Sequence, residues 1–222
     1  LKNQESVSLF QAENYWNAEA GEIRYQIAGG CGIDSTLAQC YASLYGLPDI
    51  FDPERNRTTL LSIFRYNYKP SFRDVFNPWR IYALNDESGV QICTWPHGNR
   101  PAIPVPYHTE TMHGFEWAFA AHLVMAGMPR EAKNVVRSIR SRYDGIKRNP
   151  WNELECGSNY ARSMASYALL PAWSGFRFDL SRGMIGFEPP GGAKKLSCFW
   201  SIGSAWGVYA QEKRSAKIRI IH

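Results

Sequence analysis

The spacing of apolar residues changes at Gly175, and this change constrains the fold more than any other feature of the chain. Before Gly175, apolar side chains recur at intervals of three and four residues, as in helices that bury one face. After Gly175, short apolar runs are separated by Gly and Pro, as in strands joined by turns. Helices followed by strands favour an α-rich domain with terminal β structure over a βαβ fold.

Five segments before Gly175 have the end signals of helices. One begins near Asp34 and ends at Gly46, and a second has Asp52 as its N-cap and Pro53 as its first residue. The other three run from about Thr109 to Gly127, from Pro129 onward, and from Ser158 and Asn159 to Gly175. The expected strands are 176–179, 184–187, 197–201 and 216–221.

Between the second and third expected helices lies a long segment, 68–108, rich in Pro, Trp, Tyr and Asn. A compact domain seldom keeps a connection of this length unless it builds a site. We expect the segment to form one wall of a cleft.

The composition is that of a globular protein, with 45% hydrophobic and 20% charged residues. No linker or block of like charge divides the 222 residues. The first residue is Leu1 and no targeting pattern follows it, so we expect a start that was cut from a longer chain. No apolar run reaches the length of about 18 residues that would indicate a transmembrane segment.

The five cysteines are widely spread and show neither zinc-site spacing nor a disulfide framework. We therefore expect reduced thiols and a reducing compartment, the cytoplasm.

The formal net charge of +5 raises the alternative of a nucleic-acid partner, and the densest basic stretch is 130–148. Apolar residues at helical spacing occupy one face of that stretch, which leaves the basic side chains on the others. This pattern favours a solvated helix face and no nucleic-acid partner.

The richest polar stretch is NPWNELECGSNYARSMAS, residues 149–166. Glu153, Glu155 and Trp151 precede a helix start, and Arg162 lies in the first turns of that helix. Such a group can hydrogen-bond sugar hydroxyls and stack on a ring face. The alternative is that the two glutamates only stabilise the helix N-terminus and pair with Arg162.

Asp34 follows a Gly-rich turn and precedes a helical pattern. Its spacing is that of an N-cap residue. A carboxyl group at such a place among apolar neighbours could also act as an acid. Spacing does not separate these two roles.

The stretch 94–117 is dense in polar and aromatic residues, among them Trp95, His97 and Glu110. His108, Glu110 and His113 invite a metal site, but their spacing matches no ligand motif, and we expect no metal.

In order and spacing, these three stretches resemble the catalytic region of glycoside hydrolase family 116, which includes bacterial β-glucosidases and the non-lysosomal glucosylceramidase. The resemblance covers about residues 15–175. Its most specific part is WNELECGSNYAR, and Pro96-His97-Gly98 matches a further family segment.

The resemblance implies a role for particular residues. Asp34 matches the family's acid/base aspartate, which is followed five residues later by Gln39. Glu153, Arg162 and Glu110 match residues that contact the sugar, and Trp151 and His97, within matching segments, complete the expected substrate-binding set. Family members have an (α/α)6 toroid, act with retention and need no cofactor.

The chain departs from the family around the acid/base aspartate. Ser35, Ala38 and Cys40 stand where the family usually has glutamine, glycine and tryptophan. These positions line the wall near the leaving group and bear on the choice of aglycone. The family's nucleophilic glutamate lies well upstream of the aspartate, and none of the glutamates that precede Asp34 has its setting. These are Glu5, Glu13, Glu19 and Glu22.

The resemblance thus implies part of an (α/α)6 catalytic domain in residues 1–175, whose upstream half is missing, with a β-rich C-terminal segment in 176–222. It implies a retaining β-glycosidase that hydrolyses β-glucosides, including glucosylceramide-like ones, and that is inactive as this piece alone. The alternative is a non-catalytic toroid that binds carbohydrate. The oligomeric state stays open.

Overall fold

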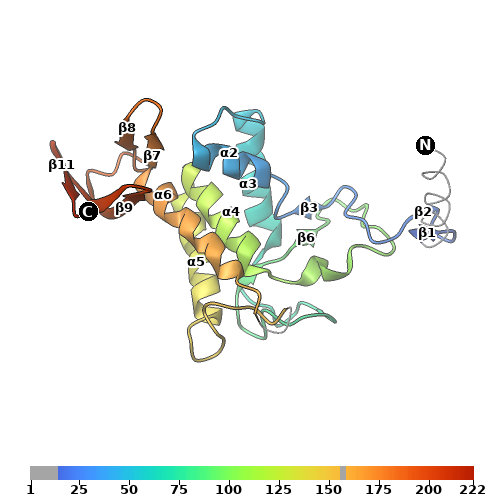
Figure 1. Ribbon diagram of the computed structural model, residues 1–222. Coiled ribbons are helices and arrows are strands. Elements are labelled where there is room, and N and C mark those ends of the chain that lie inside the picture. Colours follow the sequence, from blue (N-terminus) through green and yellow to red (C-terminus); the bar gives the residue numbers. More distant parts are fainter. Residues whose placement is uncertain (1–14, 156–158) are drawn as a thin grey trace, which may run out of the picture. The chain divides into compact units, whose positions relative to one another are not determined.

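The computed structural model describes residues 15–155 and 159–222. The chain divides into two compact units (Figure 1). Unit 1 comprises residues up to Ser35 together with Leu61–Met112, and unit 2 comprises Thr36–Leu60 and His113–His222. The helix α3 (Pro53–Asn67) contributes its first half to unit 2 and its second half to unit 1.

Unit 1 is built from short antiparallel strand pairs and a 3-10 helix, η1 (Pro106–Thr109). The pairs are β1 (Trp16–Asn17) with β2 (Glu22–Ile23), β3 (Cys31–Gly32) with β6 (Cys93–Thr94), and β4 (Tyr68–Lys69) with β5 (Gly89–Val90).

The buried side chain of Asn67 connects these strands. Its amide nitrogen donates to the carbonyl oxygens of Cys31 at 2.7 Å and Gln91 at 3.1 Å, and its Oδ1 accepts from the hydroxyl of Thr94 at 2.7 Å. Buried polar groups need such partners, so one residue at the end of α3 binds both strands of the β3–β6 pair and the residue that follows β5.

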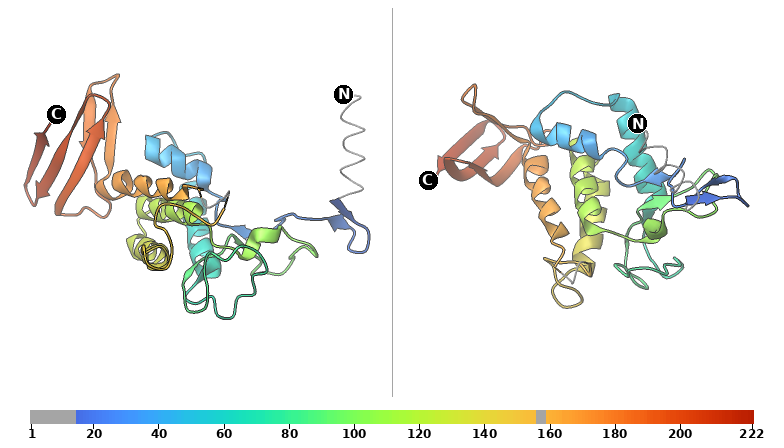
Figure 2. Two further views of the ribbon diagram at one scale, coloured as in Figure 1. Left: turned by 60° about the horizontal axis from the view of Figure 1, so that its bottom comes forward. Right: turned by 45° about the vertical axis from the view of Figure 1, so that its right-hand side comes forward.

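Unit 2 has α4 (His113–Met125) at its centre. This helix contacts α2 (Leu37–Tyr45), α5 (Pro129–Arg142), the 3-10 helix η2 (Arg162–Ala168) and α6 (Leu169–Ser174) (Figures 1 and 2). Its sequence is apolar on nearly every side, as expected for a helix with neighbours all round. By contrast, α5 buries one face and exposes most of its basic residues, as the spacing of 130–148 predicts. The expectation is wrong for Arg142, which is fully buried.

Most helix ends follow the local sequence signals. The backbone amide of Arg55 donates to Oδ1 of Asp52 at 2.9 Å, so Asp52 caps α3 as predicted. Gly46 and Gly175 end α2 and α6 in the left-handed conformation, which glycine adopts without a steric penalty. The last expected helix is wrong in its first half, which is the 3-10 helix η2. Its expected start at Ser158 lies outside the described residues.

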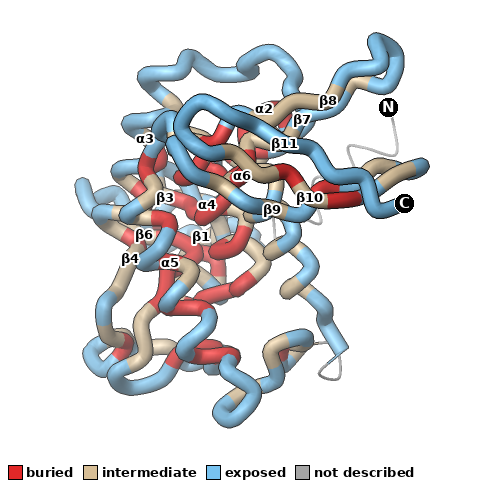
Figure 3. Tube along the Cα trace, turned by 90° about the vertical axis from the view of Figure 1, so that its left-hand side faces the viewer, coloured by how far each residue is buried: buried red, intermediate tan, exposed pale blue. Residues whose placement is uncertain are grey.

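The C-terminal strands form two antiparallel sheets. One pairs β7 (Phe176–Asp179) with β8 (Met184–Phe187), at the expected residues, and the other has the order β11-β10-β9. Its strands are β9 (Lys195–Ile202), β10 (Ala205–Glu212) and β11 (Ser215–Ile220). The sequence analysis missed β10. The ring of Phe187 stacks on that of Tyr209 at 3.9 Å, whereas β11 is exposed along its whole length (Figure 3).

The expected fold, a mainly α (α/α)6 toroid, is wrong. The described residues form five α-helices together with several small antiparallel sheets, a mixed α/β fold. Unit 1 contains short strand pairs, including strands in the segment 68–108, where apolar spacing gave no strand signal because each strand has only two residues. The division expected at residue 175 stays a prediction.

Among the described residues, no helix is both long enough and apolar enough to cross a lipid bilayer. Four of the cysteines, Cys31, Cys40, Cys93 and Cys198, are free thiols, and Cys156 lies outside the described residues. Burial raises the pKa of Cys40 and of Cys93 to about 12, so these two thiols stay protonated and unreactive.

Candidate functional site

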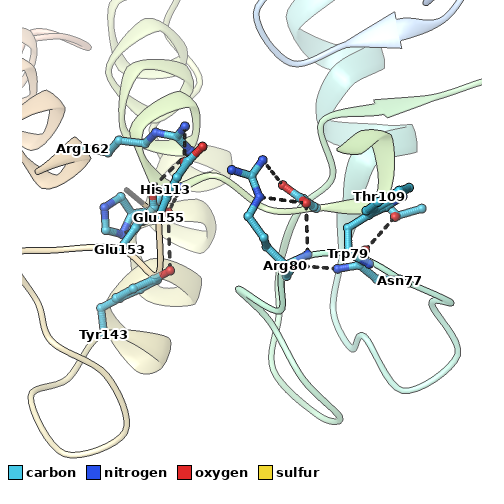
Figure 4. Close-up of polar contacts among 10 residues, drawn as sticks. Asn77, Trp79, Arg80, Thr109, His113, Tyr143, Glu153, Glu155 and Arg162 are labelled. Carbon is cyan, nitrogen blue, oxygen red and sulfur yellow. Dashed lines mark hydrogen bonds and ion pairs between the residues drawn. The ribbon is translucent and has the colours of Figure 1, made fainter. Parts of the chain in front are cut away.

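Arg162 lies between two glutamates in unit 2 (Figure 4). Its guanidinium is 3.2 Å from Oε2 of Glu153 and 2.5 Å from Oε2 of Glu155. The backbone makes this meeting possible, because Glu153 forms an antiparallel bridge with Tyr160 and the chain then turns directly into η2. The WNELECGSNYAR segment thus brings together the three charged residues that the sequence analysis expected to act together.

Glu153 is fully buried. Its Oε1 accepts hydrogen bonds from the backbone amide of His113 at 3.0 Å and from the hydroxyl of Tyr143 at 3.4 Å. Loss of water around the carboxyl group raises the pKa of Glu153 to about 7, and the His113 amide and Arg162 oppose this rise only in part. Glu153 therefore gains or loses its proton near neutral pH.

His113 is the least solvated polar residue of the cluster. Its ring is fully buried, its Nδ1 lies 3.7 Å from Oε1 of Glu153, and neither ring nitrogen has a hydrogen-bond partner among the described residues. Burial, with Arg142 and Arg162 nearby, lowers the pKa of His113 to about 3. The ring is therefore neutral and packs edge-on against Tyr143 at 4.4 Å between centroids.

Beneath this cluster lies a second ion pair, between Arg142 of α5 and Glu116 of α4, and both side chains are fully buried. Buried ions need such pairing because each loses its hydration. The pair ties α5 to α4 at the end where Tyr143 reaches Glu153.

Arg162 packs against the first turn of α4. A β-carbon on Gly114 would lie 3.0 to 3.3 Å from the side-chain carbons of Arg162, so the arginine would have to move by a few tenths of an ångström to accommodate it. The guanidinium stacks over the ring of Tyr160 at 4.4 Å, and the side chain is 16% exposed. Arg162 also lines a cavity of about 1110 Å³ within unit 2.

Asp34, in unit 1, is exposed within the turn that follows β3. The N-cap of α2 is Thr36, and the carboxylate of Asp34 makes no hydrogen bond or ion pair with any residue that the structure describes. The alternative that Asp34 caps the helix is therefore wrong.

Thr36 takes part in a hydrogen-bond network around His122. Its hydroxyl pairs with Nδ1 of His122 at 3.2 Å, and the side-chain amide of Asn56 pairs with Nε2 of the same ring at 3.1 Å. Burial lowers the pKa of His122 to about 4, so the ring is neutral and bridges the starts of α2 and α3 to α4.

Gln39 anchors the loop after α2. Its carbonyl oxygen accepts from the backbone amides of Ile50 and Phe51, and its nitrogen donates to Ser43 and to Asp49. All of its hydrogen-bonding capacity is used within the protein.

Glu110, in unit 1, is buried and paired with Arg80. Its Oε1 accepts from the backbone amide and the Nε of Arg80, and its Oε2 accepts from the terminal nitrogen at 2.9 Å (Figure 4). The guanidinium of Arg80 is about one-third exposed. A ligand at this place would meet the arginine before the glutamate.

The two remaining predicted residues are exposed. Trp151 is 71% exposed and is fixed through its backbone, by Asn149 and Ser163. His97 packs edge-on against Tyr66 at 5.6 Å between centroids. The sequence analysis missed His113 and Tyr143 as partners of Glu153. Polar residues on the otherwise apolar α4 pattern were the available signal.

No group of three or more His, Cys, Asp or Glu side chains in residues 15–155 and 159–222 could hold a metal ion. No protein-family model matches the chain, and no curated protein matches it either. The resemblance to glycoside hydrolase family 116 therefore rests on the motifs quoted above.

Proposed function

We propose that this chain carries the acid/base and sugar-binding residues of a retaining β-glycosidase that acts on β-glucosides. The observation that carries the proposal is the free carboxylate of Asp34, at the position where the resemblance expects the acid/base. A catalytic acid has to reach the substrate oxygen, and a carboxylate occupied by a helix cap could not.

The arrangement around Arg162 supports the sugar-binding part. A guanidinium donates hydrogen bonds and a carboxylate accepts them. The carboxylate of Glu155, which lies beside the guanidinium of Arg162, is 19% exposed. The two groups side by side can bind both the oxygen and the hydrogen of neighbouring sugar hydroxyls. Glu153 is fully buried and pairs with the guanidinium of Arg162, so it holds the arginine side chain in place. The protonation state of Glu153 sets the net charge of the Glu153–Arg162 pair.

In the reaction, Asp34 donates its proton to the departing glycosidic oxygen while a nucleophilic carboxylate attacks the anomeric carbon. The anionic Asp34 then takes a proton from the water that hydrolyses the glycosyl–enzyme bond. The resemblance implies that the nucleophilic carboxylate precedes Asp34 in the sequence. We assign this role to no residue of this chain.

The test is Asp34→Asn in the protein at its natural length. Hydrolysis of β-glucosides with poor leaving groups should fall by about 10² to 10⁴, whereas good leaving groups should lose less in the glycosylation step. The free energy of unfolding should not change by more than about 0.5 kcal/mol, since the carboxylate has no partner among the described residues. Equal activity of the two proteins on both substrate types would exclude Asp34 as the acid/base. Sugar binding without any turnover by the unmodified protein would favour the non-catalytic alternative.

The sugar contact of Arg162 and its support by Glu153 are tested with Glu153→Ala and Arg162→Ala, alone and together, on a β-glucoside and its 4-deoxy and 6-deoxy analogues. The single changes should cost about 2–4 kcal/mol in kcat/KM on the glucoside and less on the analogue that lacks the contacted hydroxyl. Equal losses on all three substrates would mean that the pair has only a structural role.

A further inference from the structure

The cavity beside Arg162 is larger and more apolar than a site for a sugar alone requires. It measures about 1110 Å³, slightly above the range of about 300–1,000 Å³ typical of small-molecule sites. It lies entirely in unit 2, between α2, α4, η2 and α6 and against β7 and β9. Apolar side chains make up most of its wall.

Many of these side chains are aromatic and have uncovered rings. Tyr45 is 75% exposed, Tyr167 is 70% exposed and Phe178 is 54% exposed. Tyr41 and Tyr45 stack with their rings nearly parallel, 14° apart, on one wall of the cavity. Ring faces of this kind favour a flat aromatic ligand, which gains stacking contacts as well as burial.

The charge of the lining has one sign. Among the described residues that line the cavity are two arginines, Arg162 and Arg177, and no Asp or Glu. The two glutamates described above neutralise Arg162. The guanidinium of Arg177, on β7 beside Phe178, makes no hydrogen bond or ion pair with any residue that the structure describes.

We propose that this cavity binds a flat aromatic molecule with one negative charge, whose carboxylate or sulfonate pairs with Arg177. The guanidinium offers two parallel N–H donors to such a group. The cavity is shared with Arg162, which we assign to sugar binding, but neither Arg177 nor Phe178 is assigned to sugar binding or to proton transfer.

The experiment uses three probes with the same ring system, measured by isothermal titration calorimetry. They are naphthalene-2-carboxylate, the uncharged 2-naphthylmethanol and the cationic 2-naphthylmethylamine. The carboxylate should bind about tenfold more tightly than the alcohol, and the amine should bind most weakly. Equal affinities for the carboxylate and the alcohol, or no binding of either, would overturn the proposal.

Variants assign the two parts of the site. Arg177→Gln should abolish the preference for the carboxylate and leave the affinity for the alcohol unchanged. Phe178→Ala should weaken the carboxylate and the alcohol by the same factor. The matched control is Arg140→Gln, which removes an exposed arginine of α5 that does not line the cavity, and it should change neither affinity.

One further outcome and one control bear on the assignment to Arg177. If Arg162→Gln rather than Arg177→Gln abolished the preference, the anion would bind at the sugar-binding arginine and the assignment to Arg177 would be wrong. Far-UV circular dichroism and thermal unfolding of each variant separate loss of binding from loss of fold. Arg177 and Phe178 are exposed, so both variants should fold.

Discussion

The backbone amide of His113 donates a 3.0 Å hydrogen bond to the carboxylate of Glu153, forty residues later in the chain. The first turn of α4 leaves amides without intrahelical partners, and Glu153 satisfies one of them. In return the helix N-terminus favours a negative charge on Glu153. Burial opposes that charge and prevails, since the pKa of Glu153 rises to about 7.

Glu153 should make the stability of the fold depend on pH. Its pKa is higher in the folded than in the unfolded chain, so its contribution is complete at low pH and is lost as the pH rises from about 4.5 to about 7. Urea unfolding of Glu153→Gln and of the unmodified chain at several pH values isolates this effect. The unmodified chain should lose up to about 1.4 kcal/mol per pH unit relative to the variant. A constant difference between the two would contradict the raised pKa.

The comparison with Glu153→Gln is necessary because two histidines change the stability of the fold with pH in the opposite direction. The pKa values of His113 and His122 are lowered to about 3 and about 4, so their contribution is present above pH 6.5 and is lost as the pH falls. The variant retains both histidines, and their effects cancel in the difference.

The ion pair of Arg142 and Glu116 should be costly to break from one side. Arg142→Met leaves Glu116 buried without its cation and should lower the free energy of unfolding by about 3–5 kcal/mol. The double variant Arg142→Met/Glu116→Leu removes both charges and should recover most of that loss. Arg140→Met, at an exposed position of the same helix, is the control and should change stability by less than about 0.5 kcal/mol. A double variant as unstable as the single one would mean that the pair itself contributes the stability.

Asp52 and Asp34 precede helices in similar sequence settings and should respond differently to the same change. Asp52→Ala removes the hydrogen bond to the amide of Arg55 and should cost about 1 kcal/mol. Asp34→Ala removes no such bond and should cost nothing measurable. Chemical unfolding of the two variants decides the point, and an equal cost would show that Asp34 caps α2 after all.

Gly114→Ala should shift Arg162 relative to its two glutamates, because the new methyl group would lie 3.0 to 3.3 Å from the arginine side-chain carbons. We expect a loss of stability that becomes smaller when Arg162 is also replaced by Ala, which removes the Cγ and Cδ contacts and keeps the Cβ contact, and a double-mutant cycle measures the difference. Gly186→Ala in β8, where a β-carbon meets nothing within 4 Å, is the control. Additive effects of Gly114→Ala and Arg162→Ala would show that the methyl group acts elsewhere.

Signals that act over a few residues were sufficient to locate most helices and several strands. The cap at Asp52, the glycines at 46 and 175 and the turns around β7 and β8 need only their neighbours in sequence, and the structure has them where the pattern predicts. The grouping of Glu153, Glu155 and Arg162 was also foreseeable, since all three lie within ten residues and one bridge closes the loop between them.

Tertiary contacts decided the rest. The pairing of Glu110 with Arg80 joins residues thirty positions apart, and His113 and Tyr143 come to Glu153 from two other helices. The strand β10 is defined by its two partner strands, and the two-residue strands of unit 1 by theirs. The sequence by itself determined where the chain bends and which faces are apolar, because those properties depend on backbone and side-chain preferences within a turn or two. Only the tertiary structure decided which polar groups lose their water and which partners replace it, because burial depends on packing between segments distant in sequence.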